Sequence, residues 1–213
     1  MSDLSNNEAM GNVFNHCSWF SAGDQVYQQN TISPSVYLVK KGYLKMYRIG
    51  PKGQQQIIRL VKEGDVVGYQ SQLTREPENT SCECIVNSVL CKMNAYSIKE
   101  YIKGNEALSA HFLKLSCDEM KNTMESIVDM SQHSVFSRTA KMLLRLQSLF
   151  KIQTGESFPI RISRDDLAGW VGTRTETISR SLNEFKREGL ISLKSGSISI
   201  INIEGLEKVV TLW

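Results

Sequence analysis

The segment 163–190, SRDDLAGWVGTRTETISRSLNEFKREGL, constrains the fold more than any other stretch of the chain. It begins with Ser163, a favourable helix N-cap, and Asp165 and Asp166 then place negative charge where the helix dipole favours it. Gly172 permits the backbone conformation that ends such a helix. The sequence therefore predicts a short helix that ends at this glycine.

A second helix is predicted from about Arg174, because apolar residues again recur at helical spacing. The expected buried residues are Leu167, Ala168 and Val171 in the first helix and Ile178, Leu182 and Phe185 in the second. Two short helices joined by a tight turn that contains glycine form a helix-turn-helix. Gly189 is expected to end the second helix.

The opposite face of the second helix carries polar side chains: Glu176, Ser179, Arg180 and Asn183. In a major groove, arginine matches the O6/N7 pair of guanine, glutamate accepts from cytosine N4, and serine reads either pattern. We interpret Glu176, Ser179 and Arg180 as base-reading residues. The alternative is an ordinary solvated face on which Glu176 and Arg180 form an i,i+4 ion pair.

The same segment resembles the DNA-binding element of the CRP/FNR superfamily of bacterial transcription factors. The run 171–182, VGTRTETISRSL, carries the resemblance, and its ETISR is similar to the recognition helix of the FNR branch. The catabolite activator branch usually has an arginine where this chain has Thr175, and Ser181 is small where many such units bury an aliphatic side chain. The resemblance implies a half-site similar to TTGAT.

Residues 18–92 are rich in short runs of β-branched and aromatic residues, which Gly42, Gly53 and Gly64 separate. Regularly spaced short strands indicate a sandwich or barrel, and a jelly roll is compatible. The runs FSAGD (20–24), VYLVKKG (36–42) and EGDVVG (63–68) resemble, in their order, the cyclic-nucleotide-binding β-roll of the same superfamily.

A long helix is predicted from about Glu106 to Met130. Its seam follows the 4-3-4-3 spacing of a coiled coil and consists of Leu113, Cys117, Met120, Met124 and Ile127. A second stripe, Leu108, Phe112 and Leu115, is expected to pack on the β-roll. The resemblance agrees, since this helix is similar to the family's dimerisation helix and implies a homodimer.

The predicted fold class is α+β: an N-terminal cyclic-nucleotide-binding-like β-roll, a long dimerisation helix and a C-terminal winged helix-turn-helix. The predicted domains are residues 1–104 for the roll, 105–133 for the dimerisation helix and hinge, and 134–213 for DNA binding. A helix over 135–150 and a hairpin that turns at Ser195–Gly196 complete the last domain. From residue 134 onward, 12 Lys or Arg stand against 8 Asp or Glu, which suits double-stranded DNA as partner.

Residues at the edge of the expected interface could contact phosphate, which positions a protein without reading sequence. The candidates are Thr173, Arg174, Thr177, Lys194 and Ser195. The polar loop 153–159 resembles a surface that family activators present to RNA polymerase, although such loops usually have no partner. The sequence shows no catalytic triad, paired carboxylates or P-loop, so no enzyme is predicted.

Family members that bind cyclic nucleotides carry a Gly-Glu pair for the ribose and an Arg-Ser pair for the phosphate. Here Gly68 is followed by Tyr69, and Asn79–Ser81 stand near the Arg-Ser position. A phosphate buried without a cation is heavily penalised, and Arg75 could serve only if the loop were rearranged. Cyclic AMP is therefore not expected. A module that binds a cyclic nucleotide or another small anion is kept as the alternative function.

The five cysteines lack the clustered spacing of an iron–sulfur site, since only Cys17 is near the N-terminus. Cys91 and Cys117 are scattered, and Cys82 and Cys84 are interpreted as small buried residues, with a redox pair as the minority alternative. The scattered His16, His111 and His133 do not predict a haem site, so no metal or cofactor is expected.

The N-terminus, MSDLSNNEAMGN, has neither the basic nor the apolar region of a signal peptide. No run approaches the roughly 20 apolar residues that a membrane span needs. A cytoplasmic protein with reduced thiols is therefore expected.

Overall fold

The computed structural model describes residues 14, 16–51, 53–93, 95–154, 160–194 and 196–212. By its internal contacts the chain divides into two compact units, Met1–Glu119 and Met120–Trp213. The predicted boundaries at 104/105 and 133/134 instead follow the ends of helices, and they stay predictions.

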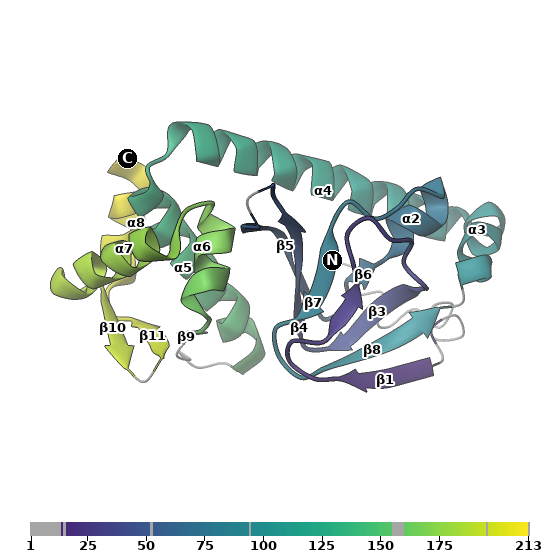
Figure 1. Ribbon diagram of the computed structural model, residues 1–213, viewed down its shortest axis with the longest axis horizontal. Coiled ribbons are helices and arrows are strands. Elements are labelled where there is room, and N and C mark those ends of the chain that lie inside the picture. The colour runs from purple at the N-terminus through teal and green to yellow at the C-terminus, as the bar shows by residue number, and fades with distance from the viewer. Residues whose placement is uncertain are drawn as a thin grey trace. The chain divides into compact units, whose positions relative to one another are not determined.

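The elements of the first unit are shown in Figure 1 and follow one another along the chain. They are β1 (His16–Phe20), β2 (Gln25–Tyr27), β3 (Val36–Lys41), β4 (Tyr43–Ile49), β5 (Gln55–Lys62), β6 (Val66–Val67), α2 (Tyr69–Thr74), β7 (Ser81–Cys84), β8 (Ser88–Met93) and α3 (Ala95–Gly104). Helix α4 (Glu106–Gln132) begins in this unit and continues into the second.

The described strands of the first unit form two antiparallel four-stranded sheets, β1-β8-β3-β6 and β2-β7-β4-β5. The side chains of β3 alternate between two cores: Tyr37 and Val39 pack with residues of the second sheet, and Val36 and Leu38 face the helices. Because β3 is covered on both faces, its sequence is a continuous apolar run. The predicted β-roll is confirmed.

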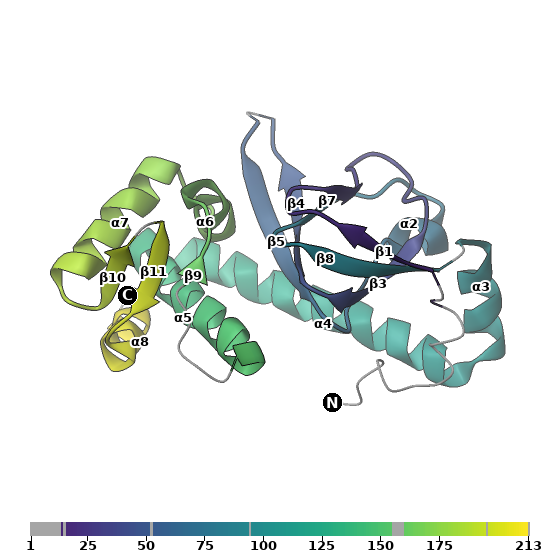
Figure 2. The same cartoon turned by 90° about the horizontal axis from the view of Figure 1, so that it is seen from below.

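Gly53, one of the glycines that separate the predicted strands, lies in a turn between β4 and β5. The Gly50 amide donates to the Gln54 carbonyl at 2.9 Å, and Gly53 has a φ of 75°, a value that glycine adopts without strain. The two strands extend as a long hairpin, which Figure 2 shows projecting beyond the other strands of the roll.

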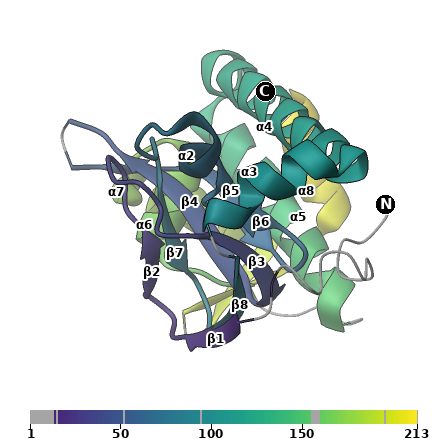
Figure 3. The same cartoon turned by 90° about the vertical axis from the view of Figure 1, so that its right-hand side faces the viewer.

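Helices α3 and α4 cover one face of the first sheet (Figure 3). Ile98 of α3 and Leu108 and Phe112 of α4 belong to the same buried cluster as Val36, and Leu115 packs against it. The expected second stripe of α4 is therefore confirmed. The Asn105 side chain accepts from the Leu108 amide at 3.0 Å and caps the start of α4.

The second unit contains α5 (Val135–Thr154), β9 (Ile160–Arg161), α6 (Arg164–Val171), α7 (Thr175–Arg187), β10 (Ile191–Lys194), β11 (Ser197–Ile200) and α8 (Ile203–Leu212). Its sheet has the order β10-β11-β9, so the predicted wing hairpin is confirmed. Helix α5 extends beyond the predicted end at residue 150. Of the loop predicted at 153–159, the first two residues are therefore helical, and 155–159 lie outside the described residues.

The expectation that all five thiols are reduced is wrong for two of them. Cys17 of β1 and Cys91 of β8 are direct partners in the antiparallel register and are joined by a disulfide. Cys82 and Cys84 are free and buried, as expected, because both side chains point into the core between the sheets. Cys117 is free and exposed on α4, where the sequence analysis places it in the predicted seam.

Burial raises the pKa of the Cys84 thiol to about 11 and raises that of Cys82 further. The thiolate is the nucleophile, so both residues should react slowly near neutral pH. We predict that a thiol-specific disulfide reagent at pH 8 labels Cys82 and Cys84 of the folded protein slowly and labels both rapidly after denaturation. The measurement uses the Cys117→Ser variant, so that Cys82 and Cys84 are the only thiols outside the disulfide. Rapid labelling of the buried pair would revive its redox interpretation.

Candidate nucleic-acid interface

Helix α6 is built by the caps that its sequence predicts. The Ser163 hydroxyl accepts from the Asp166 amide at 2.9 Å and donates to the Asp166 carboxylate at 2.7 Å. Gly172 has a φ of 72° and ends the helix, with its amide donating to the Ala168 carbonyl at 2.9 Å. Trp170 is also buried, although the sequence analysis did not include it in the apolar stripe.

Helix α7 is anchored by Ile178, Leu182 and Phe185, each fully buried as expected. Phe185 packs against Phe136 of α5, with ring centroids 4.3 Å apart. Ser181 is buried as well, so a small side chain stands at this point of the helix packing. The polar face of α7 must therefore point away from the core.

A side-chain hydrogen bond ties the two helices of the motif together at their first turns. The Thr175 hydroxyl donates to the Asp165 carboxylate at 2.7 Å. Asp165 was predicted only as a charge that favours the start of α6. In the structure it also fixes where α7 begins, one residue before Glu176.

The side chains predicted to read bases lie together on the outer face of α7. Glu176 and Arg180 are exposed, and Ser179 is half-buried. Among the described residues, the side chains of Glu176 and Arg180 have no ion-pair or hydrogen-bond partner. The i,i+4 ion pair of the alternative interpretation is therefore not formed. The Ser179 hydroxyl donates to the Thr175 carbonyl at 2.9 Å, and its oxygen still has lone pairs that can accept.

The phosphate-contact candidates flank this face. Arg174 is exposed and precedes α7 without capping it through its side chain, and Thr173 and Thr177 are half-buried beside it. The first amides of a helix lack internal partners and attract anions. Lys194 is exposed at the end of β10, whereas Ser195 lies outside the described residues.

The predicted seam of α4 is exposed over its whole length. Leu113, Met120, Met124 and Ile127 have exposed fractions between 56% and 68%, and Cys117 is exposed beside them. Monomeric proteins rarely expose such a contiguous row of large apolar side chains. The row is therefore a candidate interface.

Two side chains near the position of the family's nucleotide-binding motif, Tyr69 and Glu78, are buried in the roll. The Tyr69 ring is buried against Phe112, with centroids 5.2 Å apart. The buried Glu78 carboxylate accepts from the Ser71 amide at 3.1 Å. Neither side chain offers a positive charge to a phosphate.

A largely buried guanidinium in the same unit, that of Arg59, is already neutralised. Arg59 pairs with Asp65 at 3.1 Å and with Glu119 of α4. Burial lowers the pKa of Arg59, but the two carboxylates outweigh burial and raise it above its ordinary value. Gln70 donates to the same Glu119 at 2.9 Å. The residues present therefore do not fit a cyclic nucleotide phosphate.

No cluster of three or more histidine, cysteine, aspartate or glutamate residues with metal-binding geometry occurs in the described part of the chain. Nor does any helix described there combine the length and apolarity that a membrane crossing requires.

Two family models match the chain: the cyclic nucleotide-binding domain over residues 18–105 and the Crp-like helix-turn-helix domain over residues 137–209. The nitrogen fixation regulation protein FixK of Bradyrhizobium diazoefficiens is 26% identical over 185 residues, which cover 86% of this chain and 77% of FixK. The fumarate and nitrate reduction regulatory protein of Vibrio cholerae is 29% identical over 187 residues, with 86% and 71% covered.

The fold has close counterparts among solved structures. A crp/fnr-family regulator from Eubacterium rectale superimposes with a TM-score of 0.81 at 21% identity, over 97% of this chain and 96% of the other. FixK2 of Bradyrhizobium japonicum gives 0.78 at 18% identity, over 91% and 96%. At these identities the likeness concerns the fold alone.

The chain belongs to the CRP/FNR family, whose members are transcription regulators with a helix-turn-helix DNA-binding domain and not enzymes. This confirms the family resemblance and the predicted fold class. The individual roles of the base-reading, phosphate-contacting and seam residues stay predictions.

Proposed function

We propose that the protein is a homodimeric transcription regulator that binds a palindromic DNA site with half-sites similar to TTGAT. The observation that carries the proposal is the outer face of α7, where Glu176, Ser179 and Arg180 lie together and are held outward by the buried face of the same helix. A helix of this kind fits the major groove, which is about 12 Å wide.

Arg180 is the main specificity residue of the proposal. Its exposed guanidinium has no partner within the described chain and can bind the O6/N7 pair of a guanine. Glu176 and Ser179 would contact the neighbouring bases. Contacts from Arg174 and Lys194 to phosphate would fix the orientation of α7 without contributing to the choice of sequence.

Arg180→Ala tests this assignment. The variant should lose about 1–3 kcal/mol of preference for the half-site guanine and keep weak, salt-dependent binding. Fluorescence anisotropy with two duplexes that differ only at that guanine measures the preference. Arg145→Ala is the charge-matched control, because Arg145 is exposed on α5, outside the helix-turn-helix, and its loss should leave the preference intact. Full discrimination by the Arg180 variant would refute the assignment.

The dimer is proposed to form along α4. Two copies of the seam from Leu113 to Ile127 would bury the apolar row that one copy exposes. Two recognition helices would then enter successive major grooves about 34 Å apart, one turn of the duplex, which requires a palindromic site.

Met124→Glu tests the seam, because two facing carboxylates in an apolar interface would be desolvated and would repel each other. The variant should sediment as a monomer and bind the palindrome at least about tenfold more weakly, a loss of about 1.4 kcal/mol or more. Asn122→Glu adds the same charge at an exposed position two residues away and should leave the dimer intact. A dimeric Met124 variant would exclude this seam.

We propose further that the roll takes neither cyclic AMP nor an iron–sulfur cluster. The support is the neutralised Arg59, the buried Glu78 and the absence of clustered cysteine ligands among the described residues. DNA binding is proposed to be controlled by a signal on the roll, which the sequence does not identify. This signal would reach the DNA-binding unit through α4, because that helix is part of the roll core at Leu108 and continues into the second unit. A contact between the loop 153–159 and RNA polymerase stays a prediction.

Calorimetry decides between this proposal and the alternative, a module that binds a cyclic nucleotide or another small anion. Titration with cyclic AMP to about 1 mM, a concentration that would reveal any affinity stronger than about −4 kcal/mol, should give no saturable heat. The unfolding temperature should not change, since only a ligand of the folded state raises it. A saturable isotherm would instead favour the alternative.

A further inference from the structure

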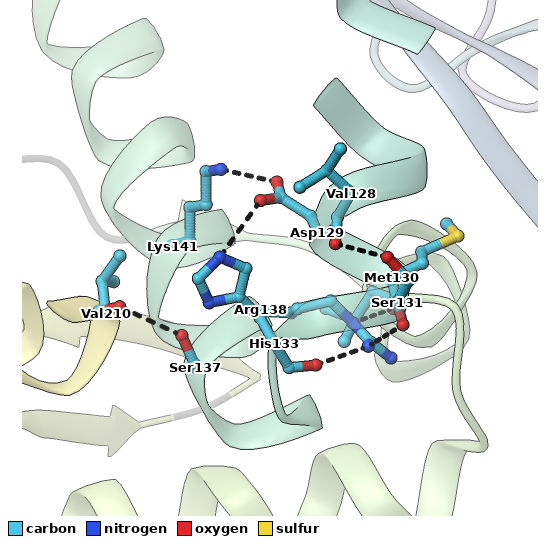
Figure 4. Close-up of polar contacts among 10 residues, drawn as sticks. Val128, Asp129, Met130, Ser131, His133, Ser137, Arg138, Lys141 and Val210 are labelled. Carbon is cyan, nitrogen blue, oxygen red and sulfur yellow. Dashed lines mark hydrogen bonds and ion pairs between the residues drawn. The ribbon is translucent and has the colours of Figure 1, made fainter. Parts of the chain in front are cut away.

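Arg138 occupies a position that the ordinary electrostatics of a helix do not favour. It lies in the first turn of α5, where the helix dipole opposes a positive charge. Its guanidinium donates three hydrogen bonds: Nη1 to the carbonyls of Met130 at 3.1 Å and His133 at 2.8 Å (Figure 4), and Nε to the carbonyl of Val171 at 3.1 Å.

The three acceptors lie at the ends of two other helices. Helix α4 ends at Gln132, so Met130 belongs to its last turn and His133 follows it; Val171 is the last residue of α6. The last carbonyls of a helix lack internal partners and carry partial negative charge. The guanidinium therefore neutralises two helix C-termini at once, which explains why a cation is tolerated here.

The side-chain type matters as much as the charge. A guanidinium has five donors fixed in one plane, whereas an ammonium is a point charge that does not impose directions on its partners. The bonds from Nη1 and Nε consequently fix the angle between the end of α4 and the end of α6. A lysine at position 138 would keep the charge without fixing this angle.

Within the described part of the chain, the other polar side-chain contacts from the end of α4 to residues beyond that helix reach only His133 and α5. Asp129 pairs with Lys141 at 2.5 Å and lies 3.8 Å from the Nε2 atom of His133 (Figure 4). Among these polar contacts and those of Arg138, the bond from Arg138 to Val171 is the one that reaches the helix-turn-helix. Val171 directly precedes the Gly172 turn, and α7 begins at Thr175.

We propose that Arg138 is a positioning residue that sets the spacing between the two half-sites that the dimer accepts. The inference rests on the proposed homodimer. The seam residues Met120, Met124 and Ile127 belong to the same compact unit as α7. The distance between the two α7 helices of a dimer therefore depends on how firmly the end of α4 is fixed to the turn before α7.

The test uses full-length protein and a palindromic duplex with the half-sites that the wild type prefers. The spacer, which is the run of base pairs between the two half-sites, is kept, shortened by one base pair or lengthened by one base pair. Wild type should bind the altered spacers at least about tenfold more weakly, because one base pair shifts a half-site by about 3.4 Å and rotates it about the duplex axis. Arg138→Ala should bind the preferred duplex more weakly. The ratio of its affinity for the preferred spacer to its affinity for an altered spacer should fall to about threefold or less.

Three comparisons separate positioning from a general loss of stability. Arg145→Ala removes the same charge from an exposed position of α5 and should keep the wild-type ratio. Arg138→Lys should relax the ratio like the alanine variant, and it provides the test if Arg138→Ala does not fold. A merely destabilised protein would lose affinity equally for all three spacers, and the ratio would not change.

The outcomes are distinguishable. A folded Arg138 variant, dimeric by sedimentation, that keeps the full spacer discrimination of the wild type overturns the inference and leaves the proposed function standing. A wild-type protein that binds as a monomer, or that is indifferent to the spacer, overturns both. A relaxed ratio with unchanged base preference within each half-site supports the positioning role.

Discussion

The packing of the apolar face of α7 into the C-terminal core is the interaction on which the rest of the structure depends. Ile178, Leu182 and Phe185 are fully buried, and each contributes about 1.5–3 kcal/mol of burial free energy. Their burial fixes the rotation of the helix about its axis. Since Glu176 and Arg180 are on the other side, that rotation alone directs them to the solvent. The bond between Thr175 and Asp165 then fixes where the helix starts.

The first unit has the fold of a cyclic-nucleotide-binding roll, but its interior charges are arranged differently from those that would bind a nucleotide phosphate. In place of a cation directed at a phosphate, Arg59 is held between Asp65 and Glu119, and Tyr69 fills space against Phe112. Breaking these partly buried pairs would leave an uncompensated charge, so Arg59 is not free to serve an anion. The pairing with Glu119 also connects β5 to α4, the helix on which the proposed dimer is built.

The features that could be predicted from the sequence are local ones. The cap at Ser163, the end at Gly172 and the apolar spacing of α7 each involve residues within a few positions of one another, and the structure confirms them. In the candidate interface, the outward direction of Glu176 and Arg180 could be predicted from the same apolar spacing of α7.

The features that the sequence analysis missed join distant parts of the chain. The Cys17–Cys91 disulfide depends on the register of β1 with β8, across a sequence separation of 74 residues. The role of Arg138 depends on carbonyls at 130, 133 and 171, and backbone carbonyls leave no mark on the sequence. One local signal was available, namely a cation in the first turn of a predicted helix, where the dipole opposes it.

Selection of bound sequences from a random pool of duplexes, with the wild-type protein, tests the central claim most directly. Two α7 helices that present Glu176, Ser179 and Arg180 should enrich an inverted repeat whose half-sites are centred about 10 base pairs apart and contain a guanine at one fixed position. Enrichment of a single unpaired half-site, or of no sequence at all, would contradict the account.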